Sequence, residues 1–225
     1  MAQRSKRYQA AIKKVDSSRD YSLEEAVGII KDTATTKFDS SIEIHANLGI
    51  DPKQGDQQVR SSLSLPHGTG KTQRVAVFTS NPDAAKKAGA DIAGGDDLIK
   101  DIQTTKKIDF DIAIAEPAMM KNMAPIAKIL GPKGLMPSPK SGTVTQDIEK
   151  AITEIKQGRV NFKNDDTGNV HSMIGRASFS AQDLLENIQA FIEALKRSKP
   201  DTSKGAFIRS VTISSSMGPG IKVKI

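Results

Sequence analysis

Residues 37–71 read KFDSSIEIHANLGIDPKQGDQQVRSSLSLPHGTGK, and the rest of the chain can be interpreted outward from them. Polar residues such as Glu43 and His45 alternate with apolar ones, which is the period of two of a strand with one wet and one buried face. We therefore predict strands at 40–50 and 57–65, joined by the turn-forming sequence DPKQGD. Taken alone, the polar face of the first strand fits ordinary surface as well as a binding site.

Two helices are predicted before this stretch. Residues 3–14 have a basic amphipathic pattern. Ser22 is followed three positions later by Glu25, the spacing of a capping box, and this pair should begin a helix that ends near Ala34.

Beyond residue 67 the pattern changes to short apolar strands that alternate with helices. FDIAIAE at 110–116 is the clearest strand, because its continuous apolar run is typical of a strand covered on both faces. A βαβαβ order of such strands predicts a small three-layer α/β domain with a mostly parallel sheet. The expected elements are strands at 74–80, 90–95 and 110–116, and helices at 82–89, 96–107, 117–130 and 147–157.

Residues 130–145, LGPKGLMPSPKSGTVT, contain too much proline and glycine for a regular element. Phosphate contact through Lys133 and Lys140 is one interpretation. A long surface loop that closes the domain is an equally good one.

The last third of the chain is predicted to contain the same kinds of element as the first third. We expect a hairpin at 159–179, a helix at 180–200 capped by Ser180, and strands at 207–216 and 221–225. The elements of either end alone would not make a full sheet with both of its faces accounted for. We therefore predict that 1–67 and 159–225 fold together as one discontinuous domain, with 68–158 inserted between them.

The composition excludes several classes of site. The chain has no cysteine, so neither a disulfide framework nor a thiolate metal site is available. Its three histidines, His45, His67 and His171, are well separated and match no metal-binding motif. No apolar run follows the basic start, and nothing approaches the roughly 20 apolar residues of a membrane span. We expect a soluble, cytoplasmic protein with no membrane partner and no cofactor.

The formal net charge of +7 favours an anionic partner. The excess of basic over acidic residues is +1 in 1–67, +2 in 68–158 and +4 in 159–225, so the two ends carry most of it. A basic arm of this kind often lies along phosphate, although a solvated helix face explains each residue equally well. The arm consists of Arg4, Lys6, Arg7, Lys13 and Lys14.

The aromatic content is 4%, without tryptophan, which argues against a protein that stacks base after base on exposed rings. A nucleic-acid partner would instead be folded RNA or a duplex, recognised through shape, phosphates and sugars.

GTGKT at 68–72 invites comparison with a phosphate-binding P-loop. That motif requires glycine at position 65, where this chain has Leu65, and the segment leads into a strand rather than a helix. A hinge between domains is the better interpretation. Paired acids such as Asp109 with Asp111 lie at element starts, where acids are ordinary, so catalysis has no positive support.

SSSMGPG at 214–220 ends a strand with small hydroxyls and a Gly-Pro turn. Such a turn lets an RNA chain approach closely and exchange hydrogen bonds with its 2′-hydroxyls and phosphates. A plain β-turn is the alternative and is slightly favoured when the segment is considered alone.

Several long segments together resemble the bacterial branch of the universal L-one family, the first protein of the large ribosomal subunit. The resemblance covers nearly the whole chain in the same order, so a chance match is very improbable. The matching segments are KRYQAAIKKVD, the whole of 37–71, ILGPKGLMPSPKSGTV, VNFKNDDTGNVHSMIGRASF, NIQAFIEAL and SSSMGP.

The resemblance implies an α/β fold: a two-layer split β-α-β domain built from both chain ends, with an inserted three-layer Rossmann-like domain. It implies a structural, non-enzymatic protein that is monomeric when free. The implied partners are large-subunit ribosomal RNA at the mobile stalk, exit-site tRNA, whose release it aids, and its own messenger leader, whose translation it represses. Opening of the domains at 66–71 and 157–160 would change access to the RNA-binding surface.

The family's RNA-binding residues, carried onto this chain, come from three segments. Serines stand at 40 and 214–216 where threonines are common in the family, so the hydroxyls are kept and the methyl packing is lost. The implied residues are Lys37, Phe38, Ser40 and Glu43, then Lys163, Asp166 and His171, and finally Ser214, Ser216, Met217 and Gly218.

Two other classes of function stay open. A nucleotide-using α/β enzyme would be stabilised by ATP or GTP, and we expect no such effect. A scaffold that binds only proteins would leave residues 214–218 indifferent to RNA.

Overall fold

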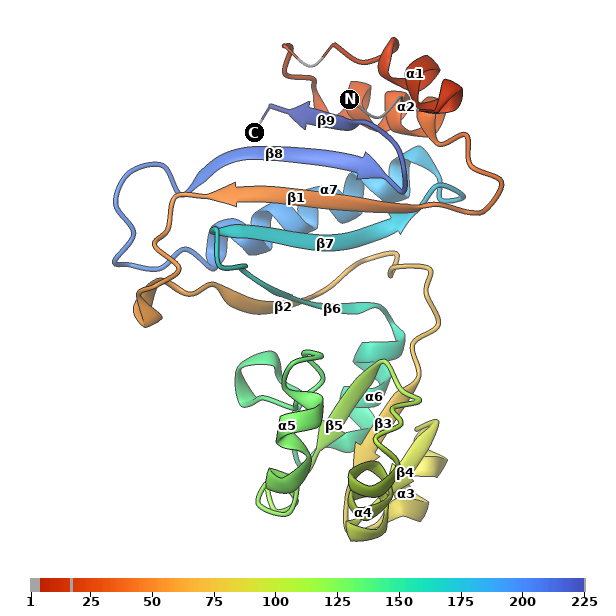
Figure 1. Ribbon diagram of the computed structural model, residues 1–225, viewed down its shortest axis with the longest axis vertical. Helices are drawn as coiled ribbons and strands as arrows, with labels where there is room; N and C mark the ends of the chain where they lie inside the picture. Colours follow the sequence, from red (N-terminus) through yellow and green to blue (C-terminus); the bar gives the residue numbers. More distant parts are fainter. Residues whose placement is uncertain (1–4, 17, 225) are drawn as a thin grey trace. The chain divides into compact units, whose positions relative to one another are not determined.

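The computed structural model describes residues 5–16 and 18–224 of the chain (Figure 1). The chain divides into two compact units. The described residues of Met1–Gly70 and Val160–Ile225 form unit 1, and Lys71–Arg159 form unit 2. Arg4, from the predicted basic arm, lies outside the described residues.

The main sheet of unit 1 has the strand order β7-β1-β8-β9, and its neighbouring strands are antiparallel. Its central strand β1 (Ser41–Leu48) comes from the first third of the chain and pairs on both sides with strands of the last third (Figure 1). Those strands are β7 (Asn169–Arg176), β8 (Ile208–Ser215) and β9 (Gly220–Val223).

The α-helices in the described residues of unit 1 are α1 (Lys6–Ile12), α2 (Leu23–Thr33) and α7 (Ala181–Arg197). Both predicted N-caps are confirmed, because Ser22 forms a capping box with Glu25 and Ser180 forms one with Asp183. The apolar stripes of α2 and α7 pack on one face of the sheet, and the core there includes Val27, Ile30, Ile44, Ile188, Phe191, Val211 and Ile213. Unit 1 is therefore a two-layer α+β structure.

The predicted hairpin at 159–179 is only partly correct. β6 (Arg159–Lys163) pairs with β2 (Arg60–Ser64) in a separate two-stranded sheet, and a single bridge, Asn164 to Val170, joins the hairpin arms. The buried side chain of Asn164 explains this pairing. The side-chain Oδ1 of Asn164 accepts a hydrogen bond from the Val59 N–H at 2.8 Å, and the backbone N–H of Asn164 donates to the Val59 carbonyl at 3.0 Å.

Unit 2 contains a three-stranded parallel sheet in the order β4-β3-β5, as the alternation of strands and helices predicted. Both faces of the sheet are covered. Ala76 and Phe78 belong to one core and Val75 and Val77 to the other, which accounts for the continuous apolar runs. The elements are β3 (Val75–Phe78), α3 (Pro82–Lys87), β4 (Ile92–Gly94), α4 (Asp96–Thr105), β5 (Ile112–Ala115), α5 (Ala127–Leu130) and α6 (Ile148–Lys156).

The helix predicted at 117–130 is wrong over most of its length. Turns occupy residues 117–123, followed by a 3₁₀ turn at Ala124–Ile126 and the single-turn α5. Pro125 explains the break, because it has no N–H to continue an α-helical ladder. Residues 131–145 are irregular apart from a 3₁₀ turn at Pro139–Ser141 and a parallel bridge from Val144 to Ala115, and the side chain of Lys140 lies outside the described part of the structure.

Candidate nucleic-acid interface

The main sheet of unit 1 has one polar face. In β1 the alternation buries Ile42, Ile44, Ala46 and Leu48 and leaves the residues between them half exposed. The register places His45 beside His171 and Thr212, and Glu43 beside Met173 and Ser214. We use the term polar face for Glu43, His45, Asn47, Asn169, His171, Met173, Thr212 and Ser214. Three predicted site residues, Glu43, His171 and Ser214, are therefore neighbours on it.

A chain of side-chain hydrogen bonds crosses the polar face. The Nδ1 atoms of His45 and His171 lie 2.8 Å apart, and His45 Nε2 lies 3.1 Å from Ser214 Oγ. One row along, Asn47 Nδ2 donates to Asn169 Oδ1 at 2.7 Å. Burial lowers the pKa of His45, the neighbouring His171 lowers it further, and Glu43 partly opposes them. His45 was not among the predicted site residues, although the alternation of β1 had placed it on the polar face.

The turn after β8 presents Met217, whose side chain is 71% exposed. Its backbone has a φ of +56°, an uncommon conformation for a residue other than glycine. The Gly218 N–H donates to the Ser215 carbonyl at 2.8 Å, and a Cβ on Gly218 would overlap the Ser215 hydroxyl. Arg7 of α1 contacts the turn, because its Nη2 donates a hydrogen bond to the Met217 carbonyl at 2.8 Å.

Phe38 lies three residues before β1. The Ser216 N–H donates to the carbonyl of Ser41 at 2.9 Å, which places the start of β1 beside the end of β8. Phe38 is 55% exposed, and it and Met217 are two of the three large apolar side chains exposed in the described residues. The third, Ile12, belongs to α1. Lys37, next to Phe38, is also exposed.

Ser40 departs from the expected site. Its side chain is 0% exposed, because it shares the buried parity of Ile42, and its hydroxyl has no hydrogen-bond partner in the structure. The Ser40 carbonyl accepts the Ala177 N–H at 2.9 Å. The side chain of Ser40 therefore lies on the buried side of the chain and not on the polar face.

Lys163, the last residue of β6, and Asp166, in the connection between β6 and β7, are exposed. Asp165 shapes this connection by accepting from Thr167 N at 2.9 Å and Asn169 N at 2.7 Å. Burial alone would raise the pKa of Asp165, but these hydrogen bonds outweigh it and hold the pKa far below its usual range. Asp165 therefore stays ionised 3.5 Å from the Nε2 atom of His171.

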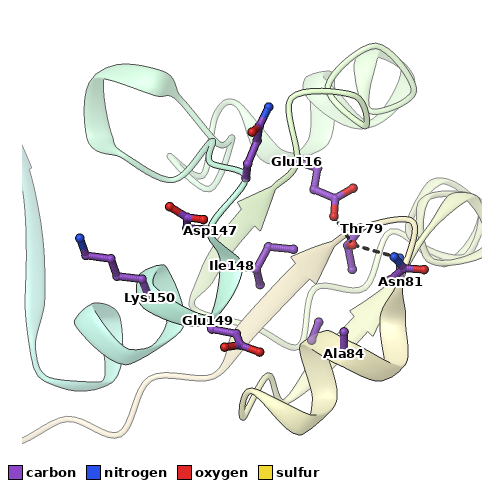
Figure 2. A pocket seen from close by; sticks show the side chains of 10 residues that line it. Thr79, Asn81, Ala84, Glu116, Asp147, Ile148, Glu149 and Lys150 are labelled. Carbon is purple, nitrogen blue, oxygen red and sulfur yellow. Dashed lines mark hydrogen bonds between the residues drawn. The ribbon is translucent and has the colours of Figure 1, made fainter.

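Unit 2 has a pocket of about 440 Å³ at the carboxyl ends of β3 and β5. In Figure 2 Thr79, Asn81 and Glu116 lie at its edge with Asp147, Glu149 and Lys150 across from them. Glu116 accepts hydrogen bonds from Thr79 and Ser80. Burial opposes ionisation of Glu116, but these bonds lower its pKa overall. Three carboxylates line the pocket, so its charge disfavours a nucleotide phosphate.

The GTGKT segment takes no part in that pocket. Lys71 forms an ion pair with Asp111 at 2.8 Å, and the chain runs on into β3 without a helix. Residues 68–72 therefore do not form a phosphate-binding loop in the described structure.

Within residues 5–16 and 18–224, no group of three or more His, Asp or Glu side chains is placed to hold a metal ion. None of the helices in that part of the chain combines the length and the hydropathy needed to cross a bilayer.

Comparison with known proteins gives one consistent family. Residues 30–219 match the model of the ribosomal protein L1p/L10e family. Proteins named large ribosomal subunit protein uL1 are similar over the full length. The one from Mesoplasma florum is 51% identical over 226 residues, covering 100% of both chains. That from Chloroflexus aggregans is 51% identical, covering 100% of this chain and 97% of its own. That from Thermosipho melanesiensis is 50% identical, covering 99% and 97%.

Proposed function

This chain belongs to the ribosomal protein L1p/L10e family, and we propose that it binds large-subunit ribosomal RNA through the polar face and adjoining turns of unit 1. The family consists of structural ribosomal proteins and not of enzymes, and in bacteria they act in the cytoplasm as part of the ribosome.

One observation carries the proposal. Two exposed apolar side chains adjoin the strands of the polar face in sequence: Phe38 lies three residues before β1 and Met217 two residues after β8, and the Ser216 N–H donates to the Ser41 carbonyl at 2.9 Å. Exposed apolar groups close in sequence to hydroxyls and imidazoles suit a partner with both flat and polar parts. Folded RNA is such a partner, because it presents sugar edges, 2′-hydroxyls and unstacked bases together.

Each proposed contact residue has a distinct task. Lys37 and Lys163 are exposed and would position phosphates. Ser214 and Ser216, with the backbone at Gly218, would bond to 2′-hydroxyls and phosphate oxygens.

Phe38 and Met217 would supply apolar contact with sugars and bases. Glu43, Asp166 and His171 would bond to base edges and hydroxyls. Ser40 would act only by supporting the start of β1.

The finer assignments rest on the family resemblance. The RNA would be that of the mobile stalk near the tRNA exit site, where the protein would aid release of deacylated tRNA. It would also bind the leader of its own messenger and repress translation. We propose that the protein is monomeric when it is free of RNA.

Met217→Asp tests the proposal by filter binding to a stalk RNA fragment. Aspartate tolerates the positive φ at this position, so the fold should survive. An interface that loses its apolar anchor and gains a negative charge should bind at least about tenfold more weakly. Ala118→Asp is the matched control, because it adds the same charge to an exposed turn of unit 2 and should leave affinity unchanged. Equal affinity of wild type and Met217→Asp would reject the proposal.

A further inference from the structure

His45 and His171 form a hydrogen-bonded imidazole pair in the middle of the polar face. Their Nδ1 atoms lie 2.8 Å apart and their ring centroids 5.0 Å apart, with the ring planes at 60°. At that distance one proton must lie between the two nitrogens, because two N–H groups would repel and two lone pairs would not bind. The pair is linked to Ser214 through His45 Nε2.

The groups around the pair come from four elements. Glu43 of β1 has its Oε2 3.9 Å from His45 Nε2, and Asp165 before β7 has its Oδ2 3.5 Å from His171 Nε2. β8 contributes the neutral Ser214 and Thr212, and Lys222 of β9 pairs with Thr212. Lys163, the last residue of β6, and Asp166, in the connection that carries Asp165, are exposed. Two carboxylates thus face the pair directly, a setting that favours an added proton.

In the uncharged pair, the position of each proton follows from these neighbours. Ionised Asp165 favours an N–H on His171 Nε2, so His171 Nδ1 must accept from His45 Nδ1–H. His45 Nε2 then has only a lone pair, and it accepts the hydroxyl proton of Ser214. In this state the Ser214 hydroxyl cannot donate to a partner in front of the face.

Addition of one proton reverses the last bond. A proton on His45 Nε2 donates to Ser214 Oγ, and the Ser214 hydroxyl proton is freed to point away from the sheet. His171 keeps its outer N–H. Ser214 then becomes a donor beside a cation, which suits an RNA phosphate or 2′-hydroxyl oxygen. A second proton would place two N–H groups against each other, so the pair takes up only one.

We propose that RNA binding by the polar face is coupled to uptake of one proton by the His45–His171 pair, with His45 as the positioning residue that turns the Ser214 hydroxyl toward the RNA. This inference rests on the proposed function. Burial and His171 lower the pKa of His45 in the free protein, which favours the uncharged form of His45 near neutral pH. RNA that binds the protonated form better must then draw in a proton.

Two measurements test the coupling with a stalk RNA fragment. Calorimetric titration near pH 7, in buffers of different ionisation enthalpy, should show uptake approaching about one proton per complex. Filter binding between pH 5.5 and 8 should show affinity rising as pH falls, by up to about tenfold per pH unit.

Two variants separate the pair from other protonation events. His45→Gln keeps a donor toward Ser214 but removes the imidazole that would turn its hydroxyl, so its pH slope should fall well below that of the wild type after subtraction of effects from the RNA itself. His67→Gln removes the only histidine outside the pair and should keep the wild-type slope.

RNA binding without proton uptake, or with an unchanged slope in His45→Gln, would overturn the coupling and leave the RNA-binding function intact. Failure of wild type to bind the RNA at any pH would overturn both.

Discussion

Asn187 of α7 joins three segments of unit 1 through one buried side chain. Its Oδ1 accepts the His67 N–H at 3.1 Å, and its Nδ2 donates to the carbonyls of Gly68 at 3.0 Å and Ile174 at 2.8 Å. Arg176 adds a bond from Nε to the Gly70 carbonyl at 3.0 Å. Residues 67–70, part of the predicted hinge, are therefore anchored to unit 1, and a point of bending would have to follow Gly70.

Asn187→Leu should destabilise unit 1 by about 2–4 kcal/mol. Leucine has a similar volume but leaves the buried Ile174 carbonyl and the part-buried His67 N–H and Gly68 carbonyl without this partner, and a fully buried unpaired group costs about 1–3 kcal/mol. Urea unfolding with equal slopes for wild type and variant would measure the change. Gln189→Leu, on an exposed position of the same helix, should stay within about 0.5 kcal/mol of wild type. A loss below about 1 kcal/mol in Asn187→Leu would contradict the anchoring role.

Local patterns predicted some of these residues well. Ser22 and Ser180 were identified as caps because capping depends on spacing within one turn of helix. The link from His45 to His171 could not be predicted, because a strand register between residues 126 positions apart has no local signal. Ser40 could have been excluded by the parity of Ile42, which shares its face.

At the scale of elements, α7 carries an acidic pair that binds His67. Glu186 Oε2 lies 2.7 Å from His67 Nε2, and Asp183 Oδ1 lies 3.6 Å from His67 Nδ1. The hydrogen bond to Glu186 raises the pKa of His67, with help from the charges of both acids. A pKa raised on folding means that this contact stabilises the fold below the ordinary value of 6.5 and stops doing so as pH rises through the folded-state value.

An NMR titration should therefore find the pKa of His67 above 6.5 in the folded protein. Glu186→Gln should bring it back toward that value, whereas Glu193→Gln, about two turns further along α7 and paired with Arg197, should leave it unchanged. The free energy of unfolding of wild type, relative to His67→Gln, should decline between pH 6 and pH 8. An advantage that grows with pH would contradict the sign of this linkage.

The pairing of elements was harder to predict than their existence. Every strand was predicted, because period-two and continuous apolar patterns are local. The partner of β6 was wrong, since the neighbouring turn suggested a hairpin while the buried Asn164 joins the chain to Val59 instead. In unit 2 the parallel order followed from the helical crossovers, and Pro125 should have shortened the helix predicted there.

At the scale of the whole molecule, β1 connects the two ends of the chain. It hydrogen-bonds to β7 on one side and to β8 on the other, and these two strands supply His171 and Ser214 to the polar face. The candidate interface therefore cannot form from either end of the chain alone. The residues proposed to contact RNA lie in three segments, the first more than 100 positions before the other two, and only the family resemblance could group them before the structure did.

The most direct test of the account is an amide NMR map of the 24.2 kDa chain with and without a stalk RNA fragment. We predict that the largest shift changes fall on Phe38, Glu43, Asp166, His171 and residues 214–218, while the pocket around Glu116 in unit 2 changes little. Changes concentrated in unit 2, with the polar face unaltered, would contradict the central claim.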